Sequence, residues 1–219
     1  MRLSGILVLI LINVTNTFAQ KDAVADKEAY IKTITERSNK LVAGLKIDNS
    51  DKADKVSLIV RDQYSNLNDI HTARDLSVKE IKAKYTDKVE RDEAIAKEQK
   101  NVDAKTAKLH AEYLKKLGKH LNAEQIEGVK NGMTYNVLPI TYKAYQEQIL
   151  TLTEDQKKQI LTWLTEAREY AMDAESSDKK HAWFGKYKGR INNYLSAAGY
   201  DLKKEGVEWE KRRKAAKNN

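Results

Sequence analysis

Hydrophobic residues recur at steps of three and four along most of the chain, which is the spacing of one face of an α-helix. The first stripe predicts a helix over 26–45, and the second predicts a helix that ends near Leu76. The end near Leu76 rests on Ser77 and Glu80, which have the spacing of a capping box that starts a new helix. The two stripes are Tyr30, Ile31, Ile34, Leu41, Val42 and Leu45, followed by Val56, Ile59, Val60, Leu67 and Ile70.

The segment 77–117 carries many charges and only a sparse hydrophobic stripe. This pattern predicts one long charged helix or a projecting helical hairpin, with most of its surface in water. The stripe consists of Ile81, Tyr85, Ile95, Val102, Leu109 and Tyr113.

Two further helix starts are marked by capping boxes, in which an N-cap side chain precedes a glutamine by three residues. Asn122 stands before Gln125 in this way, and Thr153 stands before Gln156. The second box predicts a helix over 154–174.

The segment 132–142 lies between these two starts and contains strand-like residues. Pro139 lacks a backbone donor, so we expect an ordered, aromatic-rich loop there rather than a buried strand. Towards the end of the chain, helices are predicted over 180–198 and from Asp201 onward, with a basic C-terminal tail from about residue 211.

Residues that break helices are rare in this sequence. No glycine or proline occurs between Gly44 and Gly118, and Pro139 is the only proline. The sequence therefore predicts an all-α fold, a multi-helix bundle of about six to seven helices.

The first 19 residues have the form of a secretory signal peptide. Arg2 supplies a basic start, the run 6–12 is an apolar core too short to span a bilayer, and small residues precede the cleavage point near Ala19. Cleavage there would leave 20–219 as a single helical domain, periplasmic or secreted. No second long apolar run follows, so no membrane span is predicted, and the absence of cysteine excludes a disulfide.

The chain is basic, with 40 Lys and Arg against 32 Asp and Glu. Such a charge suits acidic partners, but the predicted export argues against a nucleic acid. Acidic polysaccharide, lipopolysaccharide phosphates and anionic proteins stay open as partners. The simpler explanation is that charges of both signs solvate the helix faces. The oligomeric state is left open.

An unusual helix segment over 180–198 is the candidate for a binding site. Glycines and asparagines are poor helix formers, so their presence inside a helix indicates either close packing or a site. Gly185, Gly189, Asn192 and Ser196 form a stripe of small and polar residues on one side of this helix. Tight packing against another helix and a polar pocket with aromatic walls are both compatible with that stripe.

The residue types near the stripe suit carbohydrate, because sugars stack on aromatic rings and bind amide, guanidinium and carboxylate groups through their hydroxyls. The same residue types also build structural junctions. The predicted ligand-binding residues are Trp183, Tyr187, Lys188, Arg190, Asn192, Asn193 and Tyr194, with Arg168 and Glu169 on the preceding helix.

Signals for catalysis or a cofactor are weak. Glu166, Glu169 and Asp173 could act as acid or base if they were desolvated, but a solvated face or structural ion pairs explain them more simply. His71 and Asp75 could supply two metal ligands, but a third is missing, so neither a metal nor a cofactor is predicted.

The run from Lys180 to Asp201 resembles the domain of unknown function 3826 family of exported bacterial proteins. The resemblance extends to the segments 167–174, 135–137 and 63–75, and so covers most of the chain after the signal peptide. It implies sugar binding and an association with polysaccharide-degrading bacteria, and it carries over no catalytic residue.

A local resemblance links Leu152-Thr153-Glu154-Asp155-Gln156 to a motif of Spy-type periplasmic chaperones, with 121–125 as a degenerate copy. The leading expectation is an exported, non-catalytic helical protein that binds carbohydrate during polysaccharide utilisation. A periplasmic Spy-like chaperone and a glycan-active enzyme are the alternatives.

Overall fold

The computed structural model describes residues 14–217, and the side chains of residues 26–217. The first 13 residues of the predicted signal peptide therefore lie outside the described residues. The described chain forms helices and contains no strand, so the all-α prediction is confirmed. The helices are α1 (Val14–Ala43), α2 (Ser50–Lys84), α3 (Lys88–Leu117), α4 (Ala123–Met133), α5 (Val137–Gln148), α6 (Glu154–Met172), α7 (Ser177–Ala197) and α8 (Leu202–Lys217).

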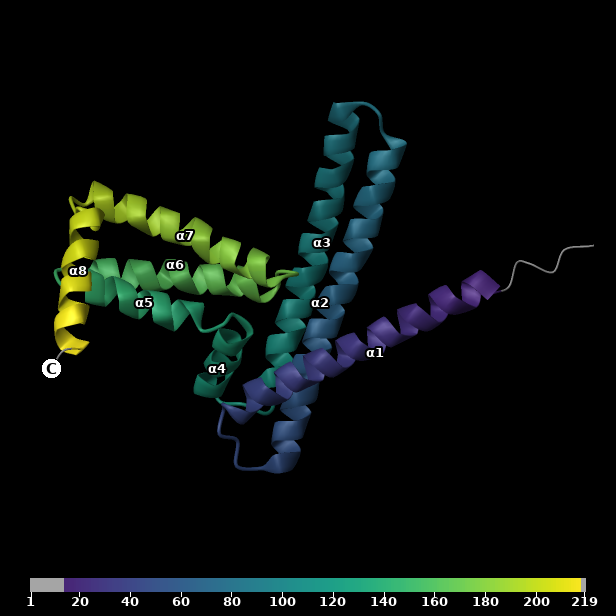
Figure 1. Ribbon diagram of the computed structural model, residues 1–219, viewed down its shortest axis with the longest axis horizontal. Helices are drawn as coiled ribbons and strands as arrows, with labels where there is room; N and C mark the ends of the chain where they lie inside the picture. The colour runs from purple at the N-terminus through teal and green to yellow at the C-terminus, as the bar shows by residue number, and fades with distance from the viewer. Residues whose placement is uncertain (1–13, 218–219) are drawn as a thin grey trace, which may run out of the picture.

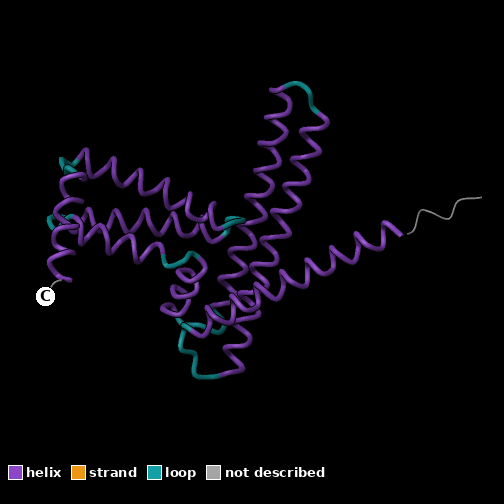
Figure 2. Tube along the Cα trace, viewed as in Figure 1, coloured by secondary structure: helices purple, strands orange, loops and turns teal. Residues whose placement is uncertain are grey.

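Two arms give the described chain its shape (Figure 1). In the first arm, α2 and α3 form a long antiparallel hairpin, and α1 crosses the lower part of that hairpin. In the second arm, α5, α6 and α7 lie side by side, and α8 crosses their far end. The short α4 connects the base of the hairpin to the second arm. Figure 2 shows that short loops join these helices, so most of the described chain is helical.

The hairpin corrects the predicted helix end near Leu76. Helix α2 runs through Ser77 and Glu80 to Lys84, and α3 starts only after Asp87, whose side chain accepts hydrogen bonds from two backbone N–H groups of the first turn. The segment 77–84 holds good helix formers, and its packing against α3 extends the helix past the local start signal. The segment Lys88–Leu117 is one long charged helix, and with α2 it forms the projecting hairpin. None of its residues from 72 to 101 is buried, so its outer half projects into solvent.

Both predicted capping boxes are present. The side chains of Asn122 and Thr153 accept hydrogen bonds from the backbone of Gln125 and Gln156, and each glutamine side chain accepts a hydrogen bond from the N-cap backbone in return. These reciprocal bonds satisfy donors that a helix start leaves free.

The loop predicted over 132–142 is mostly helix, so that prediction is wrong. Only a short turn separates α4 from α5, and Tyr135 and Asn136 in it have left-handed φ angles of 58° and 56°. Pro139 is the third residue of α5. Helix N-terminal N–H groups have no intrahelical partner, so a proline there loses no hydrogen bond.

Two hydrophobic clusters fill the interior, one in each arm. The cluster at the base of the hairpin joins α1, α2, α3 and α4 with the end of α6, and its most buried members are Val56, Val60, Leu117, Val129 and Met172. The cluster in the second arm joins α5, α6 and α7, and its most buried members are Ile160, Leu164, Ala167, Ile191 and Leu195. Each arm therefore has its own apolar interior, and Met172 at the end of α6 joins the second arm to the interior of the first.

Close packing at a glycine occurs on α4 rather than on α7. A Cβ atom on Gly132 would lie 2.9 Å from Cγ of Leu41, and one on Gly128 would lie 2.7 Å from the side chain of Leu45. No atom lies within 4 Å of the equivalent position on Gly185 or Gly189. The two glycines of α4 allow its close approach to the end of α1.

This difference predicts opposite effects of two matched substitutions. Gly132→Ala should lower the free energy of unfolding by about 1–3 kcal/mol, because Leu41 would have to move out of a packed position. Gly189→Ala should raise it by about 0.5–1 kcal/mol, because alanine favours an open helix position. Urea unfolding of both variants measures these changes. Equal effects of the two substitutions would contradict the packing.

Candidate functional site

The predicted Gly–Asn stripe of α7 is open to solvent, so tight helix packing does not explain its glycines. Asn192 accepts a hydrogen bond of 2.7 Å from the hydroxyl of Tyr145 on α5. Together with Lys188, Asn192 lines a hollow of about 490 Å³ between α5, α7 and α8. Asn193 is exposed on the surface.

Arg168 and Glu169, which were predicted to join the same site, lie elsewhere. Arg168 is 1% exposed and donates two hydrogen bonds to the carboxylate of Glu127 on α4, at 2.6 and 3.0 Å. It also donates to the side chains of Asn131 and Glu169. A buried guanidinium needs partners for its N–H groups, and those of Arg168 face two carboxylates and a side-chain amide.

Glu169 continues this arrangement towards the hairpin. Its second oxygen lies 3.0 Å from Nζ of Lys130 on α4 and 3.2 Å from Nε2 of His110 on α3. The other ring nitrogen of His110 lies 2.9 Å from the carboxylate of Asp173. We call these residues of α3, α4 and α6 the polar junction, with Arg168 and Glu127 included. The polar junction ties the end of α6 to the first arm.

The charges in the polar junction shift two pKa values strongly. Hydrogen bonds to Asp173 and then to Glu169 raise the pKa of His110 to about 9, so its imidazole is protonated at neutral pH. Burial by itself would raise the pKa of Glu169. Hydrogen bonds from His110, Lys130 and Arg168 outweigh burial and lower that pKa to about 2. Both groups are therefore held charged, which suits a structural role.

Two more contacts fix the corner where α6 ends. Nε2 of His71 on α2 lies 2.8 Å from the backbone oxygen of Asp173, so the ring N–H donates to that carbonyl. The buried Lys180 of α7 donates to the backbone oxygens of Ala171 and Met172, at 2.9 and 3.0 Å. These oxygens belong to the last turn of α6, where carbonyl groups lack intrahelical partners.

A cleft of about 530 Å³ lies at this corner, between the hairpin and the second arm, and we call it the corner cleft. One wall comes from α2 and α3, and the other comes from the end of α6 and the start of α7. Its lining residues are His71, Arg74, Gln99, Val102, Asp103, Thr106, Ala107, Tyr170, Asp173, Ala174, Glu175, Lys179 and Trp183.

An aromatic pair forms part of the wall. The rings of Tyr170 and Trp183 are stacked, with centroids 4.5 Å apart and planes inclined by 16°. Tyr170 is 48% exposed. The two rings face each other, so the apolar surface beside the polar groups of the cleft comes mainly from the half-exposed Tyr170.

The opposite wall and the floor carry hydrogen-bonding groups of both signs. Arg74 lies 2.7 Å from Asp75 and 3.4 Å from Glu175. On α3, the amide of Gln99 donates to the carboxylate of Asp103 at 2.8 Å. The corner cleft thus combines a stacking surface with carboxylates, an amide and a guanidinium.

The other predicted residues continue along the second arm, on a surface that we call the α6–α7 seam. It starts at the Tyr170–Trp183 pair and adds Glu166, Arg190, Trp163 and Tyr194, and the buried Tyr187 lies beneath it. Eight of the nine predicted residues therefore divide into three places, and the ninth, Asn193, is exposed on the surface. Trp183, Arg190 and Tyr194 share the seam with Tyr187 beneath it, Lys188 and Asn192 line the hollow by α5 and α8, and Arg168 and Glu169 belong to the polar junction.

Sequence reasoning missed Tyr170, Arg74, Asp103 and Glu175. A signal for Tyr170 exists, because Trp163, Glu166 and Tyr170 follow each other at steps of three and four on α6. The residues from α2 and α3 carry no comparable signal, since only the tertiary fold brings the hairpin to the corner.

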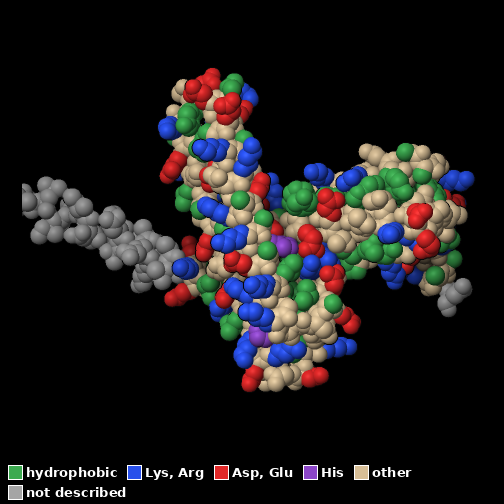
Figure 3. Space-filling view, turned by 180° about the vertical axis from the view of Figure 1, so that it is seen from behind, with side chains coloured by type: hydrophobic (Ala, Val, Ile, Leu, Met, Phe, Trp, Pro, Cys, Tyr) green, Lys and Arg blue, Asp and Glu red, His purple; other side chains and the backbone are tan. Residues whose placement is uncertain are grey.

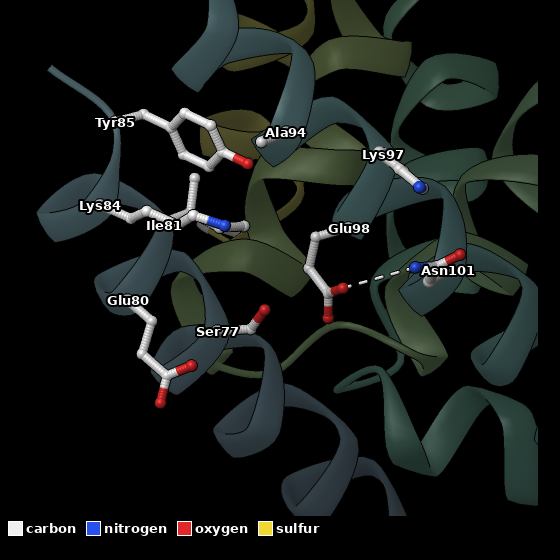
Figure 4. A pocket seen from close by; sticks show the side chains of 9 residues that line it. All are labelled: Ser77, Glu80, Ile81, Lys84, Tyr85, Ala94, Lys97, Glu98 and Asn101. Carbon is white, nitrogen blue, oxygen red and sulfur yellow. Dashed lines mark hydrogen bonds between the residues drawn. The ribbon is translucent and has the colours of Figure 1, made fainter. Parts of the chain in front are cut away.

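The hollow at the hairpin tip is a weaker candidate. It has about 350 Å³ and lies between α2 and α3, where Figure 4 shows lysine and glutamate side chains around it. Ile81 and Tyr85 are its only large apolar residues. It contains no stacked aromatic pair among the described residues, so the corner cleft is the better candidate.

A comparison with protein families covers most of the chain. The family model described as Protein of unknown function (DUF3826) matches residues 31–215, and the chain belongs to that family. No curated protein matches the chain.

None of the described helices is long and apolar enough to cross a membrane. Within the same part of the chain, no group of three or more His, Cys, Asp or Glu residues is arranged to hold a metal ion.

We expect the polar junction to make stability depend on pH at both ends of the scale. The stabilisation from His110 is complete below its ordinary pKa of 6.5 and is lost as the pH rises through about 9. The stabilisation from Glu169 is complete above its ordinary pKa of 4.5 and is lost as the pH falls through about 2.

Urea unfolding of the wild type and of His110→Gln over a pH series measures how the stabilisation from His110 is lost as the pH rises. The difference in free energy of unfolding between the two proteins should shrink as the pH rises from 6.5 to about 9. Burial lowers the pKa of Lys180 to about 8, but both proteins contain this lysine, so its titration cancels in the difference. A constant difference over this range would contradict a charged His110.

Proposed function

We propose that this protein binds carbohydrate, without catalysis, in the corner cleft. The observation that carries the proposal is the stacked Tyr170–Trp183 pair in the wall of a polar cleft. Sugar rings have apolar faces that stack on such a surface, while their hydroxyls bind charged and amide groups. Gln99, Asp103 and Arg74 supply those groups from the hairpin.

The surroundings of the carboxylates favour binding over an enzyme. Glu169 accepts hydrogen bonds from three cationic side chains, and a pKa near 2 makes it a poor general acid or base at neutral pH. Asp173 is engaged by His110, and Glu166 lies 3.8 Å from Arg190. The three carboxylates that motivated the enzyme alternative are thus engaged in ion pairs.

The chaperone alternative rests on a motif that helix capping also explains. Thr153 and Gln156 form a complete capping box at the start of α6, and Asn122 and Gln125 do so at the start of α4. The Spy-like motif is thereby accounted for by helix capping. Export, a periplasmic or secreted location and a place in polysaccharide utilisation remain part of the proposal.

Calorimetric titration with a panel of neutral and acidic plant oligosaccharides tests the proposal. Trp183→Ala and Tyr170→Ala should each weaken binding by about tenfold, because Tyr170→Ala removes the exposed ring and Trp183→Ala removes the ring stacked against it. Trp209→Ala is the matched control, since Trp209 lies on α8 at the far end of the second arm and packs by Arg213. Its affinity should equal that of the wild type.

Two outcomes would overturn the proposal. The first is that the wild type binds no member of the panel. The second is that Trp183→Ala and Trp209→Ala weaken binding equally, while circular dichroism shows that neither variant has lost helix. Release of product from any oligosaccharide during the titration would revive the enzyme alternative and contradict binding without catalysis.

A further inference from the structure

Cationic side chains accompany the aromatic residues along the α6–α7 seam. The guanidinium of Arg190 lies over the ring of Trp163, 4.5 Å from its centroid, and the edge of Tyr194 meets the same indole at 5.3 Å. At the other end, Nζ of Lys186 lies 5.1 Å from the ring centroid of Trp183. Each tryptophan of the seam therefore has a cation on it.

The position of Arg190 suits recognition of an anion. Trp163 restricts the guanidinium by the ring contact, which lowers the entropy lost when a ligand binds. A carboxylate oxygen of Glu166 lies 3.8 Å from Nη1 of Arg190, and the side chains of Arg190 and Glu166 are 56% and 44% exposed. Such an exposed pair contributes little stability, so a ligand carboxylate can replace Glu166 at small cost.

The length of the seam indicates the size of the ligand. Trp183 and Arg190 are seven residues apart on α7, and Tyr170 and Trp163 are seven apart on α6. Seven residues of helix correspond to about 10 Å, which exceeds a single sugar ring. Figure 3 shows hydrophobic side chains along the second arm next to the charged hairpin. Tyr170, Glu166 and Arg190 of the seam are exposed, so a ligand can reach it.

We propose, on the basis of the proposed function, that the ligand is an acidic oligosaccharide that carries uronate carboxylates. One sugar packs on the exposed part of Tyr170, beside Trp183, at the corner cleft, and the chain continues along the seam. A carboxylate of a later sugar binds the guanidinium of Arg190. Lys186 and Lys179 lie beside the stacking end and favour the same negative charge.

The experiment compares oligogalacturonates with neutral xylo-oligosaccharides of the same lengths, by calorimetry at low and high salt. The wild type should bind the acidic series more tightly, and its affinity should rise from the monosaccharide to the chain that reaches Arg190. Arg190→Gln should weaken acidic binding by about tenfold or more and leave neutral binding unchanged, because it removes a charged hydrogen-bond donor. Added salt should weaken only acidic binding.

Lys188→Gln is the matched control. It removes one positive charge from the same helix, but Lys188 lines the hollow by α5 and α8 rather than the seam. The affinity of Lys188→Gln for the acidic oligosaccharides should match that of the wild type. Equal losses in Arg190→Gln and Lys188→Gln would show only a general charge effect and would overturn this inference.

The failures of the two proposals are distinguishable. Tight binding of neutral oligosaccharides that depends on Trp183 but not on Arg190 would overturn the proposal of an acidic ligand. The proposal of carbohydrate binding would stand. Binding of neither series would overturn both.

Discussion

The buried guanidinium of Arg168 is the constraint on which the arrangement of the two arms depends. A buried charge is costly unless it is paired, and Arg168 finds its partners on α4 as well as on α6. Glu169, next in the chain, extends the pairing through Lys130 and His110 to α3. Rotation of the second arm away from the hairpin would break these bonds together. The polar junction therefore fixes the angle between the arms.

That angle creates the corner cleft. Neither arm contains the cleft alone, because Arg74 and Asp103 come from the hairpin while Tyr170 and Trp183 come from the second arm. The polar junction lies at the base of the corner and includes Asp173, which also lines the cleft. Arg168 and Glu169, which were predicted to bind a ligand on the helix over 180–198, do not line the corner cleft and instead hold its two walls together.

Local signals in the sequence predicted most helices, whereas contacts between distant segments could not be predicted. Thr153 marks a real helix start because its capping bonds span only three residues. The same spacing at Ser77 fails, since packing against α3 carries α2 past it. Arg168 is 41 residues from Glu127, and His71 is 102 residues from Asp173. No periodicity within a helix reveals partners at such separations, so the polar junction and one wall of the cleft stayed hidden.

The fixed angle between the arms is the central claim, and a distance distribution tests it most directly. The chain contains no cysteine, so Glu93→Cys on the hairpin and Lys204→Cys on α8 would allow selective spin labelling of both arms. Pulsed electron resonance should give one narrow distribution for the doubly labelled protein and a broader one when Arg168→Met is added. A broad distribution with Arg168 present, or a narrow one that survives its replacement, would contradict the account.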